Sequence, residues 1–199
     1  MKKTVIIMVL LLVGILFVFA DEYTVASYSY LNPTYWTDET MKIRYEDETN
    51  EYMFYVSSSY STLWMIFTED DLKSIRETVD KALEWEKIAI ENKAKVSKEI
   101  PDSSLKMQIA EKSGSSFYIG SYKVPVTFSF VSTEDAGLTT LMIIGGTTTA
   151  SSNKYIDLEF QSQVITDISS FAEAISEKAI SSAIAKHNDD LNVADDLFK

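Results

Sequence analysis

The sequence predicts an α+β domain in which an antiparallel sheet, or two such sheets, of about nine strands carries two long helices. Two observations lead to this prediction. Short stretches that alternate apolar and polar residues recur between turn residues, as is typical of antiparallel strands. Two longer stretches, one in each half of the chain, carry apolar residues at helical spacing. A two-layer sandwich would bury both kinds of apolar face.

Residues 1–20 have the pattern of a bacterial secretory signal. Lys2 and Lys3 precede an apolar run over residues 4–19, and Val18 and Ala20 supply the small residues of a cleavage site. The run is shorter than the roughly 20 residues of a spanning helix. We therefore expect cleavage after Ala20, a periplasmic or extracellular location and no membrane insertion afterwards, with a retained anchor as the alternative.

The composition limits the kinds of site that the chain can carry. Loss of Lys2 and Lys3 with the signal would change the net charge from −12 to −14, and so strong a negative charge disfavours nucleic-acid partners. The chain has no cysteine and a single histidine, which leaves little from which to build a zinc site. We expect no cofactor and no metal, and a fold stabilised by its apolar core.

The first half of the mature chain contains four predicted strands. Residues 22–31 are tyrosine-rich and end at the turn Asn32-Pro33. Residues 41–46 alternate strictly, and residues 52–56 return after a polar turn, so that the two stretches predict a hairpin. The fourth strand covers residues 63–67.

The fourth strand leads into the longest predicted helix, which we expect to run to about Lys98. Thr68 can cap its start and Asp71 completes a variant of the capping box. Pro101 enforces its end. The expected buried stripe, which Trp85 and Ile88 widen, consists of Leu72, Ile75, Val79, Ala82, Leu83, Ala89 and Ile90.

The second half has the same order of elements. Five strands are predicted over residues 105–109, 117–124, 126–131, 138–144 and 155–160, with two of them meeting near Pro125. A helix then runs from Thr166 or Asp167 to His187-Asn188, before an acidic flexible tail over residues 189–199. Residues 21–188 thus form one domain with halves 21–100 and 101–188, and the repeated order of strands then helix indicates a structural pseudo-repeat.

The element order is similar to that of the whirly-type and purine-rich-element-binding folds. The chain lacks the sequence motifs of those families, and its negative charge argues against their nucleic-acid function. This similarity therefore adds no functional prediction.

Few residues stand out as chemical candidates. His187 is expected at a helix end, where the helix dipole favours a cation. Glu86 falls within the apolar stripe by helical phase, and it is expected to reach the edge of the core, a buried and functional carboxylate being the alternative. The acidic stretch over residues 46–51 is expected to be a solvated turn, with calcium binding as the alternative. Gly145-Gly146 is expected to be a turn or bulge, because it lacks the ending of a phosphate loop.

The distribution of aromatic residues is more informative. Eight of the eleven tyrosines lie within residues 23–60, together with Trp36, and Trp64 follows shortly after. Alternation along the first strand places some of these rings on the outer face of the sheet, where Tyr and Trp favour contacts with partners. Cross-strand pairs, or coverage by the second helix, are the alternative. The candidate binding residues are Tyr28, Tyr30, Tyr35, Trp36 and Tyr55.

Together these observations predict an exported bacterial protein that acts as a non-catalytic binding or structural module of the cell envelope. Its partner would be an envelope protein or a glycan. The alternative is a carboxylate-dependent hydrolase of envelope glycans, since acidic residues are plentiful and such enzymes need a pair of them.

Overall fold

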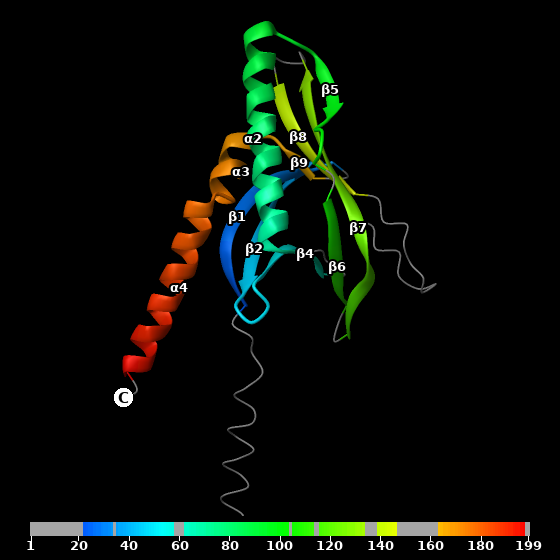
Figure 1. Cartoon of the computed structure of the whole chain (residues 1–199). Helices are drawn as coiled ribbons and strands as arrows, with labels where there is room; N and C mark the ends of the chain where they lie inside the picture. The colour runs from blue at the N-terminus through cyan, green and yellow to red at the C-terminus, as the bar shows by residue number, and fades with distance from the viewer. Residues whose placement is uncertain are drawn as a thin grey trace, which may run out of the picture.

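The computed structural model describes residues 22–33, 35–57, 62–103, 105–113, 116–133, 139–146 and 163–197. Within them the protein is an α+β domain with antiparallel strand pairing throughout, as the sequence predicted (Figure 1). The predicted signal over residues 1–20 and the predicted strand over residues 155–160 lie outside the described residues. The pseudo-repeat, which needs that strand, stays a prediction.

Nine strands form one hydrogen-bonded sheet in the described part of the chain. Their spatial order is β5-β7-β6-β4-β3-β2-β1-β9-β8. The strands are β1 Glu22–Asn32, β2 Thr37–Glu46, β3 Glu51–Ser57, β4 Thr62–Phe67, β5 Val96–Glu99, β6 Leu105–Ser113, β7 Ser116–Thr133, β8 Thr139–Gly146 and β9 Gln163–Ile165.

β7 is a single strand of 18 residues where two strands were predicted. Its first half pairs with β6, and its second half pairs with both β5 and β8. β8, the last strand in the spatial order, therefore also pairs with β7, the second strand in that order. Pro125 lies where the pairing passes from one half to the other, beside Val126, which is the first residue of β7 to pair with β8.

Three helices accompany the sheet: α2 Glu69–Asn92, α3 Ile168–Ala174 and α4 Glu177–Leu197. α2 lies along one face of the sheet with α3 beside it, and α4 leads away from α3 past β1 (Figure 1). The second predicted helix is not continuous: it breaks at Ile175 into the short α3 and the long α4. The Ser176 hydroxyl then accepts a hydrogen bond from the Ala179 N–H and so caps α4, which continues to Leu197 instead of ending at His187.

The start of α2 matches the sequence prediction and its end does not. Thr68 and Asp71 form the expected capping box. The helix stops at Asn92, because Lys93 adopts a left-handed conformation with φ 48° and ψ 43°. The Ala94 N–H then bonds to the Ala89 carbonyl at 3.0 Å, as in a Schellman motif. The residues after Ala94 form β5, which the sequence did not predict.

The hydrophobic core lies between α2 and the sheet. The helix contributes the buried Leu72, Ile75, Val79, Ala82 and Ala89, as predicted. Opposite them lie side chains at alternating strand positions: Met41, Ile43, Phe54, Met65, Phe67, Val126, Phe128 and Phe130. No helix among the described residues is long and apolar enough to cross a membrane.

Candidate functional site

Two of the five candidate binding residues lie in the core. Tyr28 and Tyr30 are only 6% and 4% exposed, so their predicted place on the outer face is wrong. The reason is a β-bulge in β1: the register with β2 shifts between Thr24 and Ala26, which adds one residue at Val25. Because strand side chains alternate with a period of two, one added residue brings the later tyrosines to the inner face.

Both buried hydroxyls are hydrogen-bonded. Tyr28 donates to Gln163 Oε1 at 2.9 Å, and Tyr30 donates to Glu39 Oε2 at 2.6 Å. Asn32 Nδ2 donates to the second oxygen of Glu39 at 2.8 Å. Burial raises the pKa of both phenols well above the ordinary value, and the bond to Glu39 adds to the effect at Tyr30. These tyrosines thus tie β1 to β9 and β2, and they do not present a binding surface.

Tyr35 and Trp36 occupy the turn between β1 and β2 and are 67% and 77% exposed. Trp36 has φ 54°, an uncommon conformation for a bulky residue, and its N–H donates to the Asn32 carbonyl at 2.8 Å. Such conformations cluster at functional sites. We call Tyr35 and Trp36 the aromatic turn. The fifth candidate, Tyr55, pairs with Lys42 in β2 and Trp64 in β4, and its side chain lies outside the described set.

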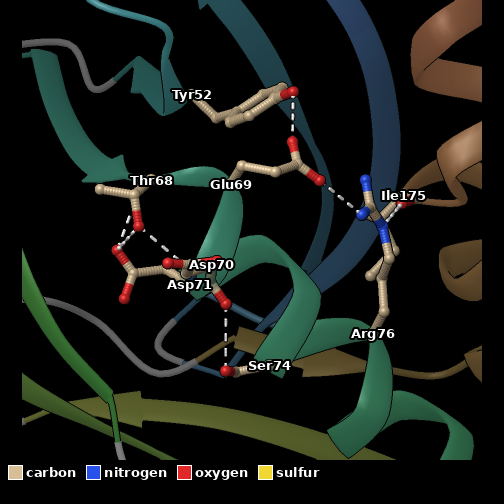
Figure 2. Close-up of polar contacts among 8 residues, drawn as sticks. All are labelled: Tyr52, Thr68, Glu69, Asp70, Asp71, Ser74, Arg76 and Ile175. Carbon is tan, nitrogen blue, oxygen red and sulfur yellow. Dashed lines mark hydrogen bonds and ion pairs between the residues drawn. The ribbon is translucent and has the colours of Figure 1, made fainter.

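A polar network joins the start of α2 to β3 and to the break between α3 and α4 (Figure 2). Glu69 accepts a hydrogen bond of 2.6 Å from the Tyr52 hydroxyl and an ion pair of 2.8 Å from Arg76 Nη1. Arg76 Nε donates to the Ile175 carbonyl at 2.8 Å. We call Tyr52, Glu69, Arg76 and Ile175 the polar joint.

The polar joint is a structural feature and offers no free acid or base. Burial, and then the hydrogen bond to Glu69, raises the pKa of Tyr52 far above its ordinary value, so the phenol stays protonated. Arg76 uses its guanidinium on Glu69 and on the carbonyl at the end of α3. The second contact supplies a partner for a carbonyl that the helix end leaves unbonded.

The remaining chemical candidates include one histidine with unusual surroundings. His187 lies within α4 instead of at its end, and its ring stacks on Tyr23 with 3.6 Å between centroids. Its Nε2 is buried without a hydrogen-bond partner among the described residues. Glu86 is half-buried. The described residues hold no group of three or more His, Asp or Glu placed to bind a metal, and residues 47–50 form an exposed turn.

An open apolar pocket of about 270 Å³ lies at the opposite end of α2 from the polar joint. We call it the α2–β5 pocket. Ile88 and Val96, which are 47% and 37% exposed, lie on its helix side and its strand side. The Lys98 ammonium lies 5.4 Å from the centre of the Trp85 ring. The lining consists of Trp85, Ile88, Ala89, Ala94, Val96, Lys98 and Phe130.

The pocket exists because α2 ends early. The left-handed Lys93 turns the chain back along β7, and the Ser132 hydroxyl holds the Ala94 carbonyl at 2.7 Å. β5 then places alternate side chains, Val96 and Lys98, toward the pocket. Sequence reasoning missed this site because it extended the helix through β5. The β-branched Val96 shortly before Pro101 was the available signal.

No family model, curated protein or solved structure matches this chain.

Proposed function

We propose that this chain is an exported, non-catalytic binding module of the cell envelope that contacts its partner through the aromatic turn. The observation that carries the proposal is the exposure of Tyr35 and Trp36, the latter in an unfavourable backbone conformation. Exposed aromatic side chains of this kind favour contact with a partner surface. The signal pattern of residues 1–20 supports export.

Two further observations favour binding over catalysis. Glu39 and Glu69 accept hydrogen bonds from the buried tyrosines Tyr30 and Tyr52 and serve the fold. The residues that line the α2–β5 pocket are apolar except for Lys98, whereas a glycan hydrolase needs two carboxylates at its cleft. The proposed partner is an envelope glycan, because aromatic rings stack on the apolar faces of sugar rings and the acidic chain disfavours anionic surfaces.

Co-sedimentation of the purified mature protein with isolated bacterial cell-wall sacculi tests the proposal. The double variant Tyr35→Ala/Trp36→Gly should stay in the supernatant while the parent protein sediments. Glycine tolerates the positive φ at position 36, so the variant should fold normally. Val193→Ala, which removes an exposed apolar group on α4, is the matched control and should sediment like the parent.

Equal sedimentation of the double variant and the parent would contradict the role of the aromatic turn. Release of soluble sugar fragments from the sacculi by the parent protein would instead support the carboxylate-dependent hydrolase.

A further inference from the structure

We propose that the α2–β5 pocket binds a free aliphatic monocarboxylic acid, with the chain inside the pocket and the carboxylate near Lys98. This site lies at the far end of α2 from the polar joint and is separate from the aromatic turn. It therefore goes beyond the function proposed above, and either proposal can fail without the other.

The volume and the lining of the pocket determine the length and the apolar character of the ligand chain. An apolar cavity of roughly 150 Å³ binds benzene, so a pocket of about 270 Å³ has room for a chain of about eight to ten carbons. Trp85 and Phe130 supply a firm aromatic floor, with ring centroids 6.0 Å apart in an edge-to-face arrangement. Ile88 and Val96 leave apolar surface exposed to water at the pocket, and a bound chain would cover it.

The charges near the pocket set the polar part of the ligand. Lys98 is the one charged residue among those that line the pocket, and it is exposed. Glu99 follows directly, but strand alternation directs it away from the face that carries Lys98. The acids near this end of α2, Glu86 and Glu91, are not among the lining residues. The positive charge of Lys98 in an otherwise uncharged lining complements a carboxylate and disfavours an amine.

Isothermal titration calorimetry of the mature protein with octanoate and decanoate tests the proposal. We expect saturable binding at one site, tightening by about threefold to fourfold for each added methylene. Octylamine, which has the same chain and the opposite charge, should bind more weakly than octanoate. Absence of octanoate and decanoate binding, or equal binding of octylamine, would overturn the proposal.

Two variants locate the site. Ala94→Leu adds three carbons to the pocket wall and should weaken octanoate binding by at least about tenfold. Lys98→Glu should weaken it by about five- to tenfold, because an exposed attraction becomes a repulsion. The matched control Lys73→Glu, an exposed charge reversal near the other end of α2, should have no effect, nor should Trp36→Gly.

Unchanged octanoate binding in Ala94→Leu, with the variant folded by circular dichroism, would overturn the assignment of the pocket. A stable dimer of the parent protein that Ala94→Leu dissociates, measured by analytical ultracentrifugation, would also overturn it, because a second copy would then be the occupant.

Discussion

The two ends of α2 are built on opposite principles. At its start, the polar groups are hydrogen-bonded (Figure 2). Thr68 and Asp71 form the capping box, and Arg76 bonds to Glu69 and to the Ile175 carbonyl. At its end, a lysine takes the left-handed position that glycine usually fills, and apolar side chains remain exposed around a pocket. The polar groups at the start of the helix are therefore satisfied, whereas the end of the helix leaves apolar surface that a ligand can cover.

The start of α2 holds parts of the fold together, whereas the end of α2 carries the proposed ligand site. Arg76 fixes α2 to the break between α3 and α4, so the first end determines where the C-terminal helices lie. At the second end Ile88, Val96 and Lys98 are exposed, and changes to these residues should alter binding more than stability. The three changes below, in decreasing order of expected effect, test the start of α2, the cap of α3 and the end of α2.

Arg76→Ala should destabilise the protein by about 2–3 kcal/mol, because it removes the charged partner of Glu69 and leaves the Ile175 carbonyl without a bond. Urea unfolding followed by circular dichroism measures this. Lys81→Ala is the control: it removes the exposed pair with Glu84 and should cost less than about 0.5 kcal/mol. Similar losses in both variants would show that the polar joint contributes no more than a surface ion pair.

Asp167→Ala should cost about 1 kcal/mol at pH 7, because Asp167 caps α3 by accepting a bond of 2.9 Å from the Ser170 N–H. Hydrogen bonds from Ser170 and Ser169 hold the pKa of Asp167 below its ordinary value of 3.8. The stabilisation is thus present above that value and is lost as the pH falls toward the lowered pKa of the folded state.

Asp167→Asn should keep most of the stability at pH 7, since asparagine also caps helices, but it should remove this part of the acid dependence. Urea midpoints at pH 7, 4 and 2.5 check both variants. A parent protein and Asp167→Asn variant that lose stability in parallel across this range would contradict the account of the cap.

Lys93→Gly should stabilise the protein by up to about 1 kcal/mol, because glycine adopts the left-handed conformation without the cost that a Cβ brings. Lys95→Gly is the matched control: residue 95 is not among the described residues with positive φ, and the added backbone freedom should destabilise. Thermal unfolding of both variants gives the sign of each change in stability. A lower stability of Lys93→Gly would contradict the backbone strain assigned to Lys93.

The features that the sequence predicted correctly depend on neighbouring residues. Thr68 and Asp71 lie three positions apart, and the buried stripe of α2 repeats at helical spacing. Both features could therefore be predicted from residues close together in the sequence. The bulge at Val25 depends on pairing with β2, and without it Tyr28 and Tyr30 were assigned to the wrong face.

The position at which α2 ends could not be predicted from the sequence, and the reason is different. Lys93 carries no glycine signal, and lysine ordinarily favours helix, so the predicted helix ran through β5. The α2–β5 pocket depends on that turn and was missed with it. Of the four predicted binding residues whose side chains the structure describes, Tyr35 and Trp36 are placed where a partner can reach them, and Tyr28 and Tyr30 are not.

Hydrogen–deuterium exchange of the mature protein, with and without saturating decanoate, tests the contrast between the two ends of α2 most directly. We expect added protection in residues 85–98 and in the second half of β7, and none in residues 68–76 at the polar joint. Equal added protection at both ends, or protection at the polar joint alone, would contradict it.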